Sequence, residues 1–155
     1  MTEKSLIISH RGDVDWISLN RPEVSNALNG ELTDALFTYF SELRKNKSVR
    51  VVVLDAKGRN FCAGLDLKAD DFDYSERTVS EMWSIQRRIG DIFREMRRCP
   101  QPIVSLLKGA AVGGGFSLAL ASDIRIAAQN SRMSAAYIKI GLTGADMGSS
   151  YFLPR

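Results

Sequence analysis

Apolar positions along the chain fall into short runs that fit strands and into three- and four-residue spacings that fit helices. Residues 6–9 and 14–19 are short runs rich in apolar side chains on either side of Gly12-Asp13, which predicts a β-hairpin. Residues 51–56 form an almost continuous apolar, β-branched run, which is typical of a strand buried on both faces. Later strands are expected at 103–107, at 124–128 and, as a short strand, at 132–134.

Helices are predicted between these strands. Asn29 is a plausible N-cap for a helix that ends near residues 45–46, and its apolar face consists of Leu32, Leu36, Phe40 and Leu43. A long helix over 78–98 has an inner face of Met82, Ile85, Ile89, Ile92, Phe93 and Met96. A third runs over 113–121, and residues 148–155 resemble the opening of another. The alternation of strands and helices predicts an α/β domain with a mainly parallel sheet.

Composition and charge exclude several classes of protein. The 155 residues are 45% hydrophobic and 25% charged, as in a single soluble globular domain. The net charge of +3 is too small to indicate nucleic-acid binding. The helix over 78–98 does concentrate arginines, which we interpret as a solvated face rather than an anion-binding patch: Arg87, Arg88, Arg94, Arg97 and Arg98.

Cellular location and metal binding are also constrained. We expect no membrane span, because no apolar run reaches about 18 residues. Met1 is followed by no signal-peptide pattern, and Cys62 and Cys99 form no C-x-x-C motif, so we expect a cytoplasmic protein. The acidic loop at residues 68–75 lacks the glycine and glutamate of a calcium loop in register, so we expect no metal site.

Two glycine-containing stretches follow predicted strands, at residues 60–67 and 104–120. In the second, Gly113-Gly114-Gly115 opens a helix, where free N–H groups and the absence of Cβ atoms favour a carbonyl oxygen that becomes negative during a reaction. The stretch is not a dinucleotide fingerprint, because Leu118 replaces the last glycine. The residues alone leave two interpretations open: a ligand site, or tight packing of a helix on a strand.

Four motifs in order resemble the enoyl-CoA hydratase/isomerase (crotonase) family. They are Asn26-Ala27-Leu28-Asn29, Phe61-Cys62-Ala63-Gly64-Leu65-Asp66-Leu67, the stretch from Lys108 to Gly115, and Ser122-Asp123-Ile124-Arg125-Ile126-Ala127. The resemblance covers the chain from about Leu6 to Arg155. It implies a crotonase-like (ClpP/crotonase) fold of repeated ββα units. The chain would be one core domain over residues 1–155, without the C-terminal helical region through which family members form trimers or hexamers.

The resemblance also implies a site for an acyl-CoA thioester as substrate, with no further cofactor. By position, the backbone N–H groups of Leu65 and Gly114 would form the oxyanion hole for a thioester enolate. Residues in the position of the CoA pocket are Ala27, Ala63, Leu65, Asp66, Leu67, Lys68 and Gly114.

The chain departs from the family at the catalytic acids. Ser117 and Tyr137 stand at or beside the positions where enoyl-CoA hydratases have two glutamates, and neither is a carboxylate base near neutral pH. Standard hydration is therefore not expected of this sequence. Asp146 is the acidic candidate for moving a proton, with Tyr137 and Ser117 assisting. Its other interpretation is a plain N-cap for the helix after Gly148.

Three functions follow as hypotheses. The first is an acyl-CoA enzyme of the hydratase or isomerase type that stabilises an enolate. The second is a non-catalytic acyl-CoA-binding or assembly subunit, favoured by the missing glutamates and the short chain. The third is a serine hydrolase with Ser117 as nucleophile and His10, otherwise a surface or turn residue, as base.

Overall fold

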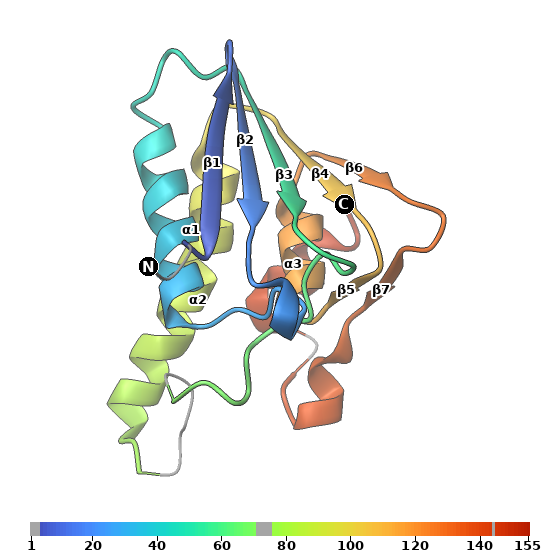
Figure 1. The fold of residues 1–155 in the computed structure, drawn as a ribbon. Coiled ribbons are helices and arrows are strands. Elements are labelled where there is room, and N and C mark those ends of the chain that lie inside the picture. Colours follow the sequence, from blue (N-terminus) through green and yellow to red (C-terminus); the bar gives the residue numbers. More distant parts are fainter. Residues whose placement is uncertain (1–3, 71–75, 144) are drawn as a thin grey trace.

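The computed structural model describes residues 4–70, 76–143 and 145–155, and of Asp146 only the backbone. A five-stranded sheet of order β1-β2-β3-β4-β6 and a two-stranded sheet of β5 and β7 carry the helices (Figure 1). The elements are β1 (Leu6–Arg11), β2 (Val14–Leu19), η1 (Pro22–Val24), α1 (Gly30–Leu43), β3 (Val51–Ala56), α2 (Val79–Arg98), β4 (Ile103–Leu107), β5 (Ala110–Val112), α3 (Gly114–Ala121), β6 (Ile124–Ala127), β7 (Arg132–Ser134), η3 (Ala136–Ile140), η4 (Asp146–Gly148) and α4 (Ser149–Phe152).

The pairing of the strands confirms the predicted hairpin and the mainly parallel sheet. β1 and β2 are antiparallel, whereas β2, β3, β4 and β6 are parallel neighbours. Gly12 has φ 61° and lies in a two-residue turn, so pairing continues to Arg11 opposite Val14. β1 is therefore longer than predicted, and His10 lies exposed in the strand opposite Asp15, which agrees with the expected surface position.

Helix α1 begins as its sequence predicts. The Leu32 N–H donates a hydrogen bond of 3.0 Å to the side-chain oxygen of Asn29, which caps the helix. The predicted apolar face is buried at all four of its positions, Leu32, Leu36, Phe40 and Leu43. The helix ends at Leu43, slightly before the expected end.

Helix α2 is only partly buried along its predicted inner face. A capping box between Thr78 and Glu81 starts the helix. Ile89, Ile92, Phe93 and Met96 are buried, whereas Met82 and Ile85 are half-buried. The first turns of α2 extend beyond the end of the sheet (Figure 1), so the apolar side chains there have less to pack against.

The expectation that β3 is buried on both faces is wrong. Val52, Leu54 and Ala56 are buried, but the alternate residues Val51, Val53 and Asp55 are only half-buried. α1 and α2 pack against one face, and the described chain covers the other face incompletely. The pattern is therefore closer to that of a strand with one core face.

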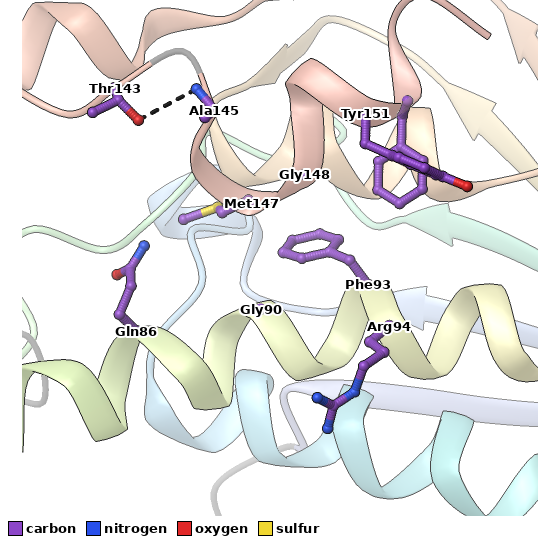
Figure 2. A pocket seen from close by; sticks show the side chains of 10 residues that line it. Gln86, Gly90, Phe93, Arg94, Thr143, Ala145, Met147, Gly148 and Tyr151 are labelled. Atoms are coloured by element: carbon purple, nitrogen blue, oxygen red, sulfur yellow. Dashed lines mark hydrogen bonds between the residues drawn. The ribbon is translucent and has the colours of Figure 1, made fainter.

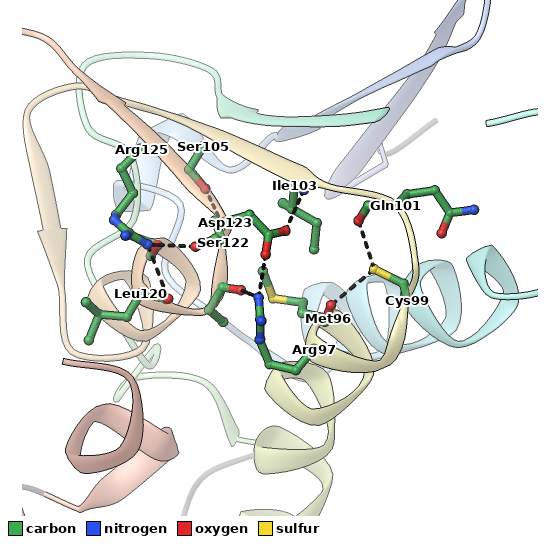
Figure 3. Close-up of polar contacts among 12 residues, drawn as sticks. Met96, Arg97, Cys99, Gln101, Ile103, Ser105, Leu120, Ser122, Asp123 and Arg125 are labelled. Atoms are coloured by element: carbon green, nitrogen blue, oxygen red, sulfur yellow. Dashed lines mark hydrogen bonds and ion pairs between the residues drawn. The ribbon is translucent and has the colours of Figure 1, made fainter. Parts of the chain in front are cut away.

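A polar junction joins the ends of α2 and α3 to the sheet (Figure 3). One oxygen of the Asp123 carboxylate accepts a bond of 2.6 Å from Arg97, and the other accepts one of 2.9 Å from the Ile103 N–H. The Ser105 and Ser122 hydroxyls are bonded beside it. Arg88, Arg94 and Arg98 also pair with carboxylates, which agrees with the interpretation of the arginine cluster as a solvated helix face. Within the described residues, no helix is both long and apolar enough to cross a membrane.

Candidate active site

The stretch that contains Cys62 and Gly64 joins two distant parts of the chain. On one side, the Cys62 N–H donates to Ala110 O at 3.0 Å, and the Val112 N–H donates to Cys62 O at 2.9 Å. On the other side, the Leu28 N–H donates to Gly64 O at 2.7 Å. These bonds are two isolated parallel bridges, and they bring both glycine-containing stretches and the loop before α1 into one place.

The glycines are needed there because backbones approach each other closely. Gly64 has φ +97°, and a Cβ added to it would lie 2.9 Å from Val112 O and 3.4 Å from Gly114 N. A Cβ on Gly115 would lie 2.3 Å from Cys62 O, a contact that real Cβ atoms essentially never make. Close packing is thus a real function of Gly64 and Gly115, and the same packing places Gly64 against the start of α3.

The two amides expected to form an oxyanion hole flank this contact. The bridge to Leu28 uses Gly64 O and the Asp66 N–H, so the Leu65 N–H points away from Leu28. Gly114 is the first residue of α3, where an N–H has no partner within its helix. In the part of the chain that the structure describes, neither amide donates a hydrogen bond. The structure therefore brings these two sequence-predicted donors to the same contact.

Ser117 and Tyr137 are also brought together, although 20 residues separate them. Both side chains are buried, and their hydroxyl groups are hydrogen-bonded to each other. The Tyr137 hydroxyl also donates a bond of 3.0 Å to Gly113 O. Among the described contacts, these hydroxyls are therefore bonded to each other and to a backbone carbonyl.

The residues expected to line the CoA pocket range from exposed to buried. Ala63, Leu67 and Lys68 are exposed, and Ala27 is buried. Asp66 is held by an ion pair of 2.9 Å with Arg21, whose side chain also donates to Ala27 O at 2.5 Å. Sequence analysis missed Arg21, because nothing in the chain pattern indicates its distant partner.

Asn26 is a second structural residue whose function sequence analysis did not assign. Its fully buried side-chain amide donates bonds of 2.9 Å to Lys57 O and Asn60 O, and its oxygen accepts one from the Arg21 N–H. Its φ of 56° lies in the left-handed region, which asparagine tolerates better than most residues. The signal was present in the quoted Asn26-Ala27-Leu28-Asn29 motif.

A cavity of about 480 Å³ lies between α2 and the η4–α4 segment (Figure 2). Its apolar side chains come from Phe93, Met147, Tyr151 and Phe152. Met147 links the cavity to the glycine contact, since a Cβ on Gly114 would lie 3.2 Å from Met147 Sδ and 2.8 Å from Leu28 Cδ1. The cavity therefore begins beside the residue that carries one of the two amides.

Asp146 begins η4, and its side chain lies outside the described part of the structure. The residue at the N-cap position of α4 is Gly148, in the left-handed conformation, and Asp146 lies two residues before it. Both interpretations of Asp146, as proton carrier and as helix cap, therefore stay predictions. Asp71 and Asp73 of the acidic loop also lie outside the described residues. The described residues contain no group of three metal-ligating side chains.

The structure does not bring His10 and Ser117 together. His10 Nδ1 lies 2.6 Å from the Asp15 carboxylate, at the hairpin end of β1, whereas Ser117 is in α3 and bonds Tyr137. Figure 1 shows that hairpin well apart from α3. Burial raises the pKa of Cys62, the other buried nucleophile nearby, to about 12, so its thiol is unreactive near neutral pH. A serine hydrolase is therefore not supported.

Comparison with known proteins shows the family of the chain. The sequence model of enoyl-CoA hydratase/isomerase matches residues 10–155. The chain belongs to the enoyl-CoA hydratase/isomerase family. It is 35% identical over 158 aligned residues to a protein named "Probable enoyl-CoA hydratase" from Mycobacterium bovis, covering 99% of this chain and 55% of that protein. It is 33% identical to the 1,2-epoxyphenylacetyl-CoA isomerase of Escherichia coli, covering 96% of this chain and 57% of that protein.

Solved structures support the same assignment. An enoyl-CoA hydratase from Mycobacterium smegmatis superposes with a TM-score of 0.86 at 31% identity, over 94% of this chain and 56% of that one. The expected crotonase-like fold is thereby confirmed. The chain spans little more than half the length of these relatives.

Proposed function

We propose that this member of the enoyl-CoA hydratase/isomerase family binds an acyl-CoA and stabilises the enolate of its thioester at the N–H groups of Leu65 and Gly114. The observation that carries the proposal is the contact at Gly64. At this contact Gly64 lies against Gly114 at the start of α3, and Leu65 is the next residue, in the bridge to Leu28. The N–H groups of Leu65 and Gly114 donate no hydrogen bond within the described residues. Fixed donors of this kind, aimed at a developing negative charge, need no reorganisation when the charge forms.

The proposed chemistry is a double-bond shift rather than addition of water. A base removes a proton from a carbon of the acyl chain, and the electron pair moves onto the thioester oxygen. Return of a proton to another carbon of the conjugated system completes the shift without any co-reactant. Hydration needs groups that hold and activate water, and the hydroxyls of Ser117 and Tyr137 are instead bonded to each other.

The remaining parts of the site are assigned by position. Asp146 is the proposed proton carrier, because it is the acidic residue of the segment that borders the cavity. The cavity beside Met147 is the proposed place of the acyl chain, because its lining is rich in apolar side chains. The exposed edge at Ala63, Leu67 and Lys68 is the proposed contact with CoA.

The proposal is tested most sharply at Leu65. Changing Leu65→Pro removes this N–H and no other described hydrogen bond of the bridge, and Gly64 has no Cβ to clash with the proline ring. Leu65→Ala is the matched control, because it changes the side chain and keeps the N–H. Calorimetric titration would compare CoA with acetoacetyl-CoA, which binds as an enolate-like ligand.

We expect the unmodified chain to bind acetoacetyl-CoA more tightly than CoA. Leu65→Pro should weaken acetoacetyl-CoA binding toward that of CoA, and should lower any turnover by about 10²- to 10³-fold, the usual cost of one oxyanion donor. Leu65→Ala should retain the preference. Equal binding of both ligands by the unmodified chain, or an unchanged preference in Leu65→Pro, would contradict the proposal.

A non-catalytic acyl-CoA-binding subunit is the second candidate. It is favoured by the bonded Ser117 and Tyr137 pair, which leaves neither hydroxyl as an evident acid or base. The two candidates differ in D₂O, where an enzyme incorporates deuterium into 3-enoyl-CoA as the double bond moves. Loss of that exchange in Asp146→Asn, with acetoacetyl-CoA still bound, would support the enzyme. Binding with no exchange in any variant would support the binding subunit.

A further inference from the structure

The peptide between Gly113 and Gly114 carries two groups that cannot move independently. Its C=O belongs to Gly113 and its N–H to Gly114, and in a planar trans peptide the two point in opposite directions. Any side chain that holds the Gly113 carbonyl therefore also sets the direction of the Gly114 N–H. Under the function proposed above, that N–H is one of the two oxyanion donors.

The residues on both sides of this peptide are glycines, which restrict its orientation less than any other residue. Gly113 has φ 53° and ψ −119°, a combination that favours glycine, and glycines stand on both sides of the peptide bond. Two adjacent residues without Cβ atoms offer little steric resistance to a flip of the peptide plane. Such a flip would turn the Gly114 N–H away from Gly64.

Three hydrogen bonds oppose that flip. The Gly113 N–H donates to Ser134 O at 3.0 Å, which fixes the preceding side of the residue. The Gly113 carbonyl accepts one bond of 3.0 Å from the Ser117 N–H, the first bond of α3. It accepts a second bond of 3.0 Å from the Tyr137 hydroxyl, which comes from a side chain.

Tyr137 is itself firmly placed. Its side chain is 2% exposed and its ring lies close to Gly113, since a Cβ on that glycine would be 3.9 Å from Tyr137 Cε1. Its hydroxyl is bonded to Ser117, and its carbonyl accepts a bond of 3.0 Å from the Leu142 N–H. A group held on both its backbone and its hydroxyl is suited to orienting a neighbour.

We propose that Tyr137 is a positioning residue that orients and polarises the Gly113–Gly114 peptide, so that the Gly114 N–H is aimed at the thioester oxygen. Hydrogen bonds that share a peptide group strengthen one another, so a bond to the C=O makes the N–H a better donor. Ser117 supports the arrangement by bonding the same hydroxyl. This inference rests on the proposed function, and it gives Tyr137 a role other than proton transfer to substrate.

The test compares Tyr137→Phe with Tyr39→Phe. Each change removes a tyrosine hydroxyl that donates a hydrogen bond, but Tyr39 bonds Asp15 beside the β1–β2 hairpin and not the glycine contact. We expect Tyr137→Phe to reduce the preference for acetoacetyl-CoA over CoA by about 5- to 10-fold, the equivalent of one neutral hydrogen bond. Where turnover is measured, kcat should fall with KM nearly unchanged. Tyr39→Phe should change none of these ratios.

A second measurement does not depend on ligand. The amide proton of Gly114, observed by NMR in the ligand-free chain, should shift upfield in Tyr137→Phe, because its peptide loses a bond at the carbonyl. Ser117→Ala should shift it less, because Tyr137 still reaches Gly113 O. If Tyr137→Phe does not fold, Ser117→Ala should still show a smaller loss of preference, and an unchanged preference there would overturn the proposal.

The outcomes separate this inference from the proposed function. If the unmodified chain does not prefer acetoacetyl-CoA, the proposed function fails, and the Gly114 amide shift alone decides whether Tyr137 holds the peptide. If the preference exists and survives in Tyr137→Phe with the amide unmoved, the positioning role is wrong. Lost turnover with an unchanged preference would also overturn it, because that result assigns Tyr137 to proton transfer.

Discussion

Two tyrosine hydroxyls lie in polar clusters at different places in this molecule, and they differ in what they hold. Beside the β1–β2 hairpin, Tyr39 on α1 donates a bond of 2.8 Å to the buried carboxylate of Asp15, which also contacts His10. At the glycine contact, Tyr137 bonds a backbone carbonyl and the Ser117 hydroxyl. One cluster is centred on a carboxylate, and in the other the described partners of the tyrosine hydroxyl are a serine hydroxyl and a peptide carbonyl.

The difference indicates what each region can do. The hairpin cluster joins side chains of β1, β2 and α1, so its effect is to hold a helix on a sheet. The cluster at the glycine contact acts on a peptide whose N–H donates no described hydrogen bond, and that N–H is the one proposed to meet the thioester. The role of each hydroxyl therefore depends on the group that accepts its hydrogen bond. Substitutions at the glycine contact and in the hairpin cluster test this comparison.

The largest effect is expected from Gly115→Ala. The new Cβ would lie 2.3 Å from Cys62 O and 2.6 Å from Cys62 Cβ, so α3 or the Cys62 segment must shift. We expect a loss of about 3 kcal/mol in the free energy of unfolding, the upper range for overpacking a core. Urea unfolding followed by circular dichroism measures it.

Gly90→Ala is the matched control for that change. A Cβ on Gly90 meets nothing within 4 Å, and the residue lies inside α2. Alanine there should raise the free energy of unfolding by about 0.5–1 kcal/mol, because it favours the helix. Equal losses at both glycines would contradict the view that backbone contact is what constrains Gly115.

The next effect is expected from Asp15→Ala, which breaks the other cluster. The Asp15 side chain is 3% exposed, and its loss leaves the Tyr39 hydroxyl without its acceptor. We expect a loss of about 2 kcal/mol in unfolding free energy, with no change in the preference for acetoacetyl-CoA over CoA. Asp15→Asn should cost less, because its amide oxygen can still accept from Tyr39. A changed ligand preference would show that the two regions are coupled.

The sequence predicts well those features that repeat along one element. The β1–β2 hairpin, the Asn29 cap and the apolar face of α1 follow from local patterns, and the structure confirms each of them. Burial does not alternate along β1 or β2, because only Leu6 of β1 is buried and Ser18 of β2 is buried with its apolar neighbours. The incomplete burial of β3 and of the start of α2 could not be predicted, because it depends on how far the neighbouring layers extend. The pairing of His10 with Asp15 could have been predicted, because a two-residue turn at Gly12-Asp13 sets these residues opposite each other.

The candidate site also combines features that local motifs predict with contacts between distant residues that they do not. The motifs predict that Leu65 and Gly114 belong to one site, and the structure places their segments in contact. Whether they bind a thioester remains a prediction. The bond between Ser117 and Tyr137 and the pairing of Arg21 with Asp66 join residues far apart in the chain. Such pairs depend on side-chain placement across several elements, which no local pattern contains.

The smallest effect concerns the alkaline stability that Tyr39 contributes. Burial, reinforced by the bond to the Asp15 carboxylate, raises the pKa of Tyr39 well above its ordinary value of 10.0. The folded chain then holds the phenol proton more tightly than the unfolded chain. The stabilisation from this group is complete below pH 10 and is lost as the pH rises above 10 toward the raised pKa.

Tyr39→Phe should therefore unfold with a shallower dependence on pH above 10 than the unmodified chain. The raised pKa of Cys62, near 12, gives a similar alkaline dependence, but it is present in both proteins and cancels in the comparison. Urea midpoints at pH 8 and pH 10.5 measure the difference. Parallel midpoints for the two proteins would show that the Tyr39 hydroxyl is not protected by Asp15, and the contrast between the two tyrosines would then rest on the ligand preference alone.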